Sequence, residues 1–81
     1  MSDTLSKLLI IADALFYFYH GKIAKALKEI QKIVNLYPRC DAAWSLRGKI
    51  FYSKDQYNEA LRSCDKAIEI NPNNADAWIT R

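Results

Sequence analysis

The sequence contains few of the residues that make tight turns. Its 81 residues include only two glycines and two prolines. Because these residues dominate tight turns, their scarcity leaves little of the chain for turns and favours long helices. Hydrophobic residues make up 51% of the sequence and charged residues 26%, which is typical of a soluble globular protein. The length allows one small domain.

Cysteine and histidine are also rare, which argues against a disulfide framework or a zinc site. Cys40 and Cys64 are the two cysteines, they lack the CxxC spacing, and the sequence has one histidine. A structural zinc site built from cysteine and histidine needs more ligands than these. We therefore expect no bound metal or other cofactor. Free thiols are typical of a reducing compartment, so the sequence predicts a cytoplasmic protein.

The sequence lacks a long uninterrupted hydrophobic run and a strong excess of one charge. The most apolar stretch, residues 8–19, contains Asp13 and is too short to span a bilayer. No lysine or arginine precedes Lys7 and no small-residue cleavage site is present, so a signal peptide is not expected. The net charge of +3 is well below that of a dedicated nucleic-acid-binding domain. We expect neither a membrane nor a nucleic acid as the partner.

What the sequence does contain is an internal repeat of 34 residues. Trp44 and Trp78 are 34 positions apart, as are Pro38 and Pro72. The same shift superposes further identical pairs, which are Ala26 and Ala60, Leu27 and Leu61, Lys32 and Lys66, Ala43 and Ala77, and Arg47 and Arg81. The single domain, residues 1–81, therefore divides into repeats at about 7–40 and 41–74 and a truncated third repeat at 75–81.

Each repeat has the pattern of two amphipathic helices. Apolar residues at three- and four-residue spacing predict helices at about residues 4–19, 22–36, 41–53 and 56–70. Asp55 is the predicted N-cap of the fourth helix, and Asn74 that of the helix after it. Pro72 marks the end of the fourth helix, because proline cannot continue a helix. Small residues at matching positions, such as Gly48 and Ala60, indicate where two helices must approach closely.

These positions resemble the signature of the tetratricopeptide repeat family. The second repeat carries the matching residues Trp44, Gly48, Phe51, Tyr57, Ala60, Ala67 and Pro72. The first repeat departs from the signature, with Ile10, Ile23 and Ile33 in the Trp, Tyr and Ala positions. The resemblance covers about residues 7–81, nearly the whole chain. It implies an all-α fold of antiparallel helix-turn-helix hairpins, stacked as a short right-handed solenoid.

The family resemblance also implies a concave groove, lined by the first helix of each repeat, in which a protein partner binds. The positions that match this groove are Leu8, Ile11, Leu15, Phe18, Tyr19, Ala42, Ser45, Lys49, Tyr52, Ser53, Asp76 and Ile79. Family members that bind the acidic C-terminus of heat-shock chaperones use Lys, Asn and Arg as a two-carboxylate clamp. None of these clamp residues is present at the matching positions, which are Ile11, Leu15, Leu46, Asp76 and Thr80.

The first helix is apolar on nearly all sides, which leaves three interpretations of its surface. An apolar or amphipathic helix of a partner protein binds in the groove, or other parts of a larger protein cover the helix, or the chain associates with itself. Self-association is favoured because the truncated third repeat leaves the second repeat largely uncovered. The predicted contact residues of such a homodimer are Cys64, Ile68, Trp78 and Ile79.

Asp13, Arg47 and Arg81 occupy the same position in successive repeats. Asp13 and Arg47 therefore form either an ion pair between repeats or two separately solvated charges. An exposed ion pair contributes only about 0–1 kcal/mol to stability.

The sequence thus predicts a protein–protein interaction module that binds a partner or itself, and not an enzyme. His20 lies at a predicted turn, and no Ser, Cys or carboxylate is placed to form a catalytic dyad with it. One alternative is an accessory repeat region, or an excised fragment, of a larger enzyme or regulatory complex. A weaker alternative is RNA binding through helical repeats.

Overall fold

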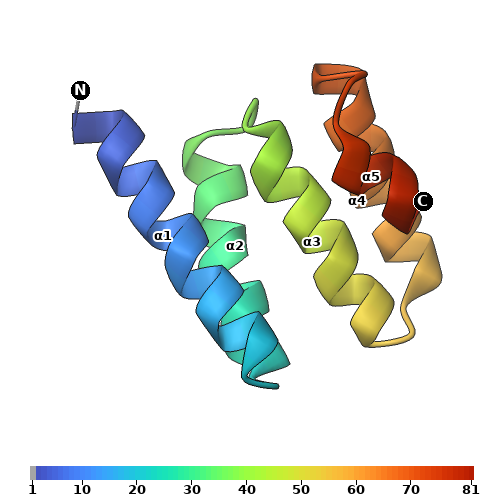
Figure 1. Cartoon of the computed structure of the whole chain (residues 1–81), viewed down its shortest axis with the longest axis horizontal. Helices are drawn as coiled ribbons and strands as arrows, with labels where there is room; N and C mark the ends of the chain where they lie inside the picture. The colour runs from blue at the N-terminus through green and yellow to red at the C-terminus, as the bar shows by residue number, and fades with distance from the viewer. Residues whose placement is uncertain (1) are drawn as a thin grey trace.

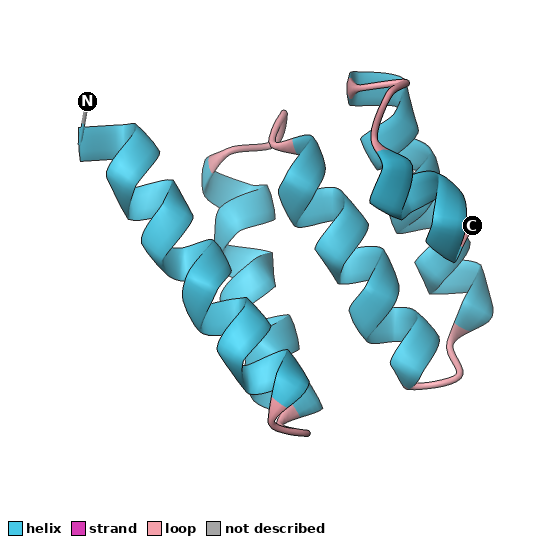
Figure 2. Cartoon of the chain, viewed as in Figure 1, coloured by secondary structure: helices cyan, strands magenta, loops and turns pink. Residues whose placement is uncertain are grey.

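A computed structural model describes the backbone of residues 2–81 and the side chains from Leu5 onward. Within this range the chain has no strand and folds into the helices α1 (Ser2–Tyr19), α2 (Ile23–Leu36), α3 (Asp41–Ser53), α4 (Tyr57–Ile70) and α5 (Ala75–Thr80). Short loops join the helices (Figure 2). The all-α prediction is confirmed, and the predicted bounds of α1 to α4 agree within two residues.

The helices form antiparallel hairpins that stack side by side. α1 and α2 make the first hairpin, α3 and α4 make the second, and α5 packs against both helices of the second hairpin. α2 packs against α3 as well as α1, which joins the two hairpins (Figure 1). This arrangement is the predicted short solenoid of helical hairpins.

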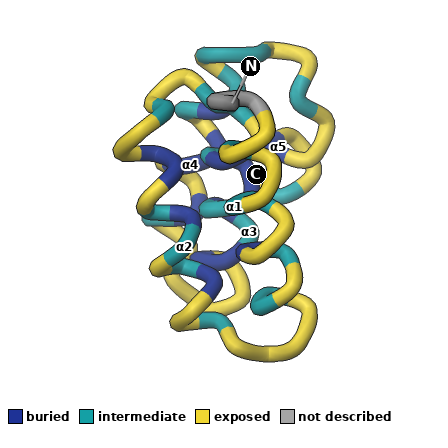
Figure 3. The backbone as a smooth tube through the Cα atoms, turned by 90° about the vertical axis from the view of Figure 1, so that its left-hand side faces the viewer, coloured by how far each residue is buried: buried dark blue, intermediate teal, exposed yellow. Residues whose placement is uncertain are grey.

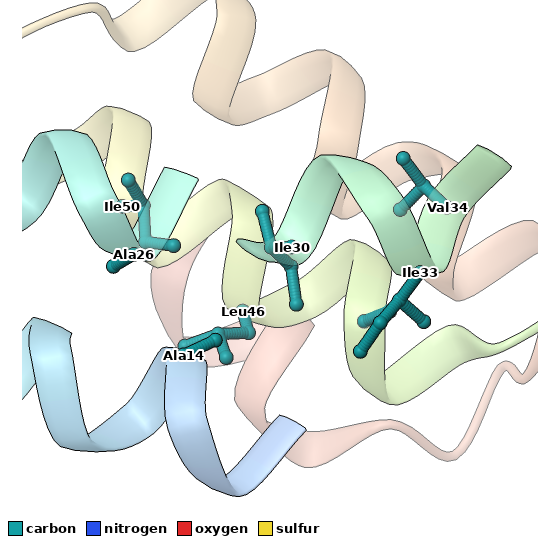
Figure 4. Close-up of a cluster of buried hydrophobic side chains, with 8 residues drawn as sticks. Ala14, Ala26, Ile30, Ile33, Val34, Leu46 and Ile50 are labelled. Atoms are coloured by element: carbon teal, nitrogen blue, oxygen red, sulfur yellow. The ribbon is translucent and has the colours of Figure 1, made fainter. Parts of the chain in front are cut away.

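The larger hydrophobic cluster joins the first hairpin to α3 of the second, because α2 packs between α1 and α3. Ile30 and Ile33 of α2 are fully buried and belong to one cluster with residues of α1 and α3 (Figure 4). The buried members of this cluster are Ala14, Ala26, Ile30, Ile33, Val34, Ala43, Leu46 and Ile50. A smaller cluster of Cys64, Ala67 and Ala77 joins α4 to α5. This burial stabilises the helices, which are too short to be stable alone in water.

The turn inside each hairpin has the same backbone geometry at positions 34 residues apart. Gly21 and Asp55 have positive φ angles, of 76° and 61°. In each turn the next residue donates its N–H to the carbonyl oxygen five residues earlier, with N···O distances of 2.8 and 2.9 Å. This is the Schellman motif, which ends a helix with one residue in the left-handed region.

The same geometry explains why the predicted N-cap at Asp55 is wrong. Asp55 ends α3 instead of starting α4, because its backbone is the left-handed residue of the Schellman motif. Gln56 takes the N-cap position of α4 and makes no capping bond with its side chain. The Asp55 carboxylate accepts a hydrogen bond from the Tyr57 hydroxyl at 2.9 Å. This hydrogen bond raises the pKa of Tyr57 above its usual value.

Asn74 caps α5 as predicted, and it also ties the end of the second repeat to its beginning. Its Oδ1 accepts a hydrogen bond from the N–H of Ala77 at 2.9 Å. Its Nδ2 donates to the Asp41 carboxylate at 2.9 Å, and that carboxylate also accepts from Asn71 Nδ2 at 3.0 Å. The polar residues between α4 and α5 are therefore held against the start of α3.

A tryptophan side chain makes a hydrogen bond across each junction between repeats. The indole nitrogen of Trp44 donates to the carbonyl oxygen of Pro38 at 2.8 Å. Trp78 makes the same bond to Pro72, also at 2.8 Å. The 34-residue period of the sequence is therefore also a period of hydrogen bonds.

The close approach of α3 and α4 depends on Gly48. A Cβ atom at this position would lie 2.6 Å from the Sγ of Cys64 and 3.2 Å from the carbonyl oxygen of Ala60. The first distance is well below van der Waals contact, so the hairpin has no room for a side chain here. The predicted close approach at Gly48 and Ala60 is confirmed.

We predict that Gly48→Ala destabilises the protein by about 1–3 kcal/mol, because overpacking outweighs the gain in helix propensity. Urea unfolding followed by circular dichroism measures this change. Cys64→Ala removes the Sγ atom, so the cost of Gly48→Ala should be at least about 1 kcal/mol smaller in that background. Equal costs in the two backgrounds would show that the Sγ contact does not limit the approach of the helices.

Candidate protein-binding groove

Two adjoining hollows lie on the surface that α1, α3 and α5 form. The larger hollow, of about 270 Å³, is lined by Phe18, Lys49, Tyr52, Ser53, Ile79 and Thr80. The smaller hollow, of about 120 Å³, is lined by Ile11, Leu15, Ala42, Ser45, Leu46, Lys49 and Asp76. Because Lys49 borders both, we treat the two hollows as one site and call it the groove.

The structure brings together most of the residues predicted for this site. The predicted residues that line it are Ile11, Leu15, Phe18, Ala42, Ser45, Lys49, Tyr52, Ser53, Asp76 and Ile79. Leu8 and Tyr19 line neither hollow and are 57% and 69% exposed. Both lie nearer the ends of α1, outside the stretch between Ile11 and Phe18 that lines the hollows.

Two residues that line the groove, Leu46 and Thr80, are not among the groove residues predicted from the sequence. Leu46 and Thr80 were considered only as positions of a chaperone clamp, yet both line the groove. Each follows a predicted groove residue, Ala42 or Asp76, by four positions. Residues four apart lie on the same face of a helix, so this spacing was the signal that could have found them.

The groove is mostly apolar and has one cationic side chain. Lys49 is the residue shared by the two hollows, and its Nζ lies 3.8 Å from Oδ1 of Asp76. The side chains of this pair are 31% and 64% exposed, so the pair contributes only about 0–1 kcal/mol. Lys49 can therefore exchange Asp76 for an acceptor on a ligand at little cost in free energy. Ser45 donates its hydroxyl to the carbonyl oxygen of Ala42 at 3.0 Å, within its own helix.

The residues predicted for self-association differ in their exposure. Trp78 and Ile79 of α5 are 52% and 81% exposed, while Ile68 of α4 is half-buried against the smaller core cluster. Cys64 is fully buried within the chain, so the prediction that it contributes to a contact surface is corrected. The reason is that α5 packs against α4 and that Gly48 brings α3 close to the Sγ atom.

Burial also controls the chemistry of the two thiols. It raises the pKa of Cys64, an effect that nearby Asp65 reinforces and Arg81 opposes. Cys40 is half-buried at the junction between the repeats. Since the thiolate is the reactive form, Cys64 is the less reactive of the two.

We predict that iodoacetamide at pH 8 modifies Cys40 quickly and Cys64 at least about tenfold more slowly in the folded protein. Mass spectrometry of tryptic peptides over a time course measures both rates. In 8 M urea, as the control, the two rates should become similar because burial is lost. Equal rates in the folded protein would contradict the burial of Cys64.

Arg47 links α3 to α2 and α4, the second helices of the two hairpins. Its Nε donates to Oε1 of Gln31 in α2 at 2.8 Å, and its Nη1 donates to Oγ of Ser63 in α4 at 2.6 Å. Of the two interpretations of Arg47 and Asp13, the ion pair is therefore excluded, because the guanidinium lies between α2 and α4 while Asp13 is exposed on α1. Burial lowers the pKa of Arg47, which nevertheless stays charged at neutral pH.

Among the described residues, no three His, Cys, Asp or Glu side chains lie close enough together to hold a metal ion. His20 stacks on the ring of Phe16, and its Nδ1 lies 2.8 Å from the carbonyl oxygen of the same residue. No helix in the described part of the chain is long and apolar enough to cross a membrane.

The fold and the groove together define the class of protein. It is built from repeats of a helical hairpin, and the first helices of the repeats line a shared groove. Residues 42–74 match the family model of the tetratricopeptide repeat. The chain belongs to the tetratricopeptide repeat family. Repeats of this family serve as scaffolds for protein–protein interaction.

Comparison with characterised proteins gives relatives that are much longer than this chain. The chain is 33% identical over 60 residues to anaphase-promoting complex subunit 7 of Dictyostelium discoideum, an alignment that covers 74% of the chain and 10% of that protein. It is 26% identical over 59 residues to mitochondrial import receptor subunit TOM70 of Homo sapiens, with 73% and 10% covered. The chain thus spans about a tenth of the length of these relatives.

Proposed function

We propose that this chain is a protein-interaction module whose groove binds an apolar or amphipathic segment of another protein. The observation that carries the proposal is the pair of adjoining hollows, to which three helices contribute apolar side chains around Lys49. Exposed apolar surfaces of this kind commonly mark sites of protein–protein contact. An amphipathic helix laid into an apolar groove is one of the recurring modes of such recognition.

The charges in the groove disfavour an acidic C-terminus as the ligand. Ile11 and Leu15 stand where a carboxylate clamp needs polar side chains, and Asp76 adds a negative charge at the rim. Lys49 is the one cation among the lining residues, and Asp76 already lies beside it. The ligand that fits is therefore apolar on the side that enters the groove, with at most one acceptor opposite Lys49.

The proposed function applies whether the chain acts alone or as part of a larger protein. Both relatives are named as subunits, one of the anaphase-promoting complex and one of a mitochondrial import receptor, which supports a role in assembly. We further propose a non-enzymatic role in a reducing, cytoplasmic compartment, supported by the two free thiols. RNA binding has less support, because Glu29 interrupts the lysines of α2 and pairs with Lys32 at 3.1 Å.

We predict that helical 14-residue peptides with leucine, isoleucine or phenylalanine on one face bind in the groove. Titration of the ¹⁵N-labelled protein should shift the amide signals of Leu15, Lys49 and Ile79. Tyr52→Ala should weaken binding about tenfold or more, because Tyr52 lines the larger hollow and is 53% exposed.

Leu36→Ala is the matched control for this experiment. Leu36 is 65% exposed on α2 and lines neither hollow, so its loss should leave the affinity unchanged. Equal weakening by Tyr52→Ala and Leu36→Ala, or signal shifts confined to residues outside the groove, would contradict the proposed site.

A second proposal is that the chain forms a homodimer through α5. The supporting observation is that Trp78 and Ile79 expose adjacent apolar side chains on a helix of six residues. Ile79 also lines the groove, so a dimer through α5 would compete with a ligand there.

For the homodimer we predict a mass of two chains by light scattering, measured over a hundredfold range of concentration. Ile79→Lys should shift the population to monomers, because a charge would be buried in the contact. Circular dichroism checks that this variant keeps its helices. A monomeric mass at the highest concentration would rule out the homodimer and leave the groove available to a partner.

A further inference from the structure

The positive charge of the protein is concentrated in the first repeat, on the exposed side of α2. Residues 7–40 contain six Lys and Arg against two Asp and Glu, whereas residues 41–81 contain six of each. Exposed and buried residues alternate along α2 (Figure 3). Four lysines at three- and four-residue spacing are exposed along it, and we call them the lysine face: Lys22, Lys25, Lys28 and Lys32. At helical spacing they span about 15 Å.

Most of the charge on the lysine face is not neutralised within the described part of the chain. Among the side chains from Leu5 onward, Lys32 is the one member that forms an ion pair, with Oε1 of Glu29 at 3.1 Å. Lys25, Lys28 and Lys32 also border a hollow of about 220 Å³, together with Tyr17 and Glu29. The Nζ of Lys25 lies 5.7 Å from the centre of the Tyr17 ring, a cation–π contact that keeps it at the hollow. Like charges at neighbouring positions repel one another, so an anion bound between them is favoured.

The second repeat shows that this pattern is particular to α2. Under the 34-residue shift, the last three lysines of the face correspond to Glu59, Arg62 and Lys66 of α4. Arg62 pairs with Glu59 at 3.3 Å and Lys66 with Glu69 at 3.5 Å, so this side of α4 neutralises itself. The side chains of Glu59, Arg62 and Lys66 are 43%, 78% and 40% exposed, although the first hairpin is stacked against the second. A face in this position therefore stays open whether or not another hairpin precedes it.

We propose that the lysine face binds an acidic segment of a partner protein, as a helix with Asp or Glu at every third or fourth position. A helix laid alongside α2 has the same rise of about 1.5 Å per residue, so its carboxylates match the spacing of the lysines. Complementary charges of this kind give an interface specificity and fast association. α2 lines neither hollow of the groove, so this site is independent of the function proposed above.

The position of Glu29 favours a helix over a nucleic acid or a membrane. Glu29 lies among the lysines, and its side chain is 20% exposed. A phosphate backbone or an anionic bilayer presents negative charge without gaps, so part of that charge would face this carboxylate. A protein helix can place an uncharged side chain opposite Glu29 and still keep its carboxylates opposite the lysines. The favoured occupant is therefore an acidic helix.

The test compares two synthetic peptides of the same composition. The striped peptide carries four glutamates at three- and four-residue spacing on one face of a helix, and the scattered peptide carries the same four around the helix. A hydrocarbon staple holds both peptides helical, since short helices are marginal in water. Fluorescence anisotropy measures binding of each labelled peptide to the full chain in about 0.15 M NaCl, which screens nonspecific attraction. A short oligouridylate and vesicles containing phosphatidylserine are measured in the same way.

We expect the striped peptide to bind about tenfold more tightly than the scattered one, because only its carboxylates all face the lysines. Lys28→Glu should weaken the striped peptide about fivefold. Arg62→Glu is the matched control, because Arg62 holds the position of Lys28 in α4 and its replacement changes the net charge equally. It should change the affinity less than about twofold. Glu29→Gln should tighten binding, since it releases Lys32 and removes a like charge.

Circular dichroism checks that each variant keeps its helices, and four outcomes would overturn the proposal. The first is equal binding of the two peptides, which would show attraction by net charge alone. The second is equal weakening by Lys28→Glu and Arg62→Glu, which would exclude the lysine face as the site. The third is no binding of the striped peptide at millimolar concentration. The fourth is tighter binding of the oligouridylate or the vesicles, because the occupant would then be a nucleic acid or a membrane.

Discussion

The whole structure depends on the aliphatic stripe of α2, which packs against two helices at once. Ile30 and Ile33 have no exposed surface, because α1 covers them from one side and α3 from the other. A single helical hairpin cannot bury both sides of its second helix, so repeats of this kind are stable only when stacked. The groove is a consequence of this stacking, since it brings the free faces of α1 and α3 next to each other.

Polar contacts set the register in which the hairpins stack. Arg47 bridges Gln31 and Ser63, and Arg81 with Asp65 repeats half of that arrangement. These bonds lie between helices that are also in apolar contact, so a slip of one helix would leave the guanidinium without acceptors in a partly buried place. The groove itself holds one loosely paired cation, Lys49, among apolar residues, which suits a ligand chosen mainly by shape and apolar contact.

Prediction from the sequence succeeded where residues repeat at a fixed spacing. The 34-residue period located both hairpins and the close approach at Gly48, and the family resemblance supplied most of the residues that line the two hollows, including Leu15 and Lys49. It failed where the outcome depended on a neighbouring helix or on a backbone angle. The sequence left open whether Arg47 pairs with Asp13, because a shared position in two repeats says nothing about the direction in which a side chain leaves its helix. The N-cap predicted at Asp55 is wrong because the backbone angle of a residue cannot be read from its side-chain chemistry.

By itself, the sequence determined that this chain forms helical hairpins of the tetratricopeptide type, because its apolar spacing, small residues and prolines act over distances shorter than one repeat. Only the tertiary structure decided which apolar side chains stay exposed. Cys64 is hidden under α5, whereas Phe16, which has the same position in its repeat as the buried Ile50, is half exposed. The difference is physical: burial depends on whether another helix lies opposite, and residues far apart in the chain determine that.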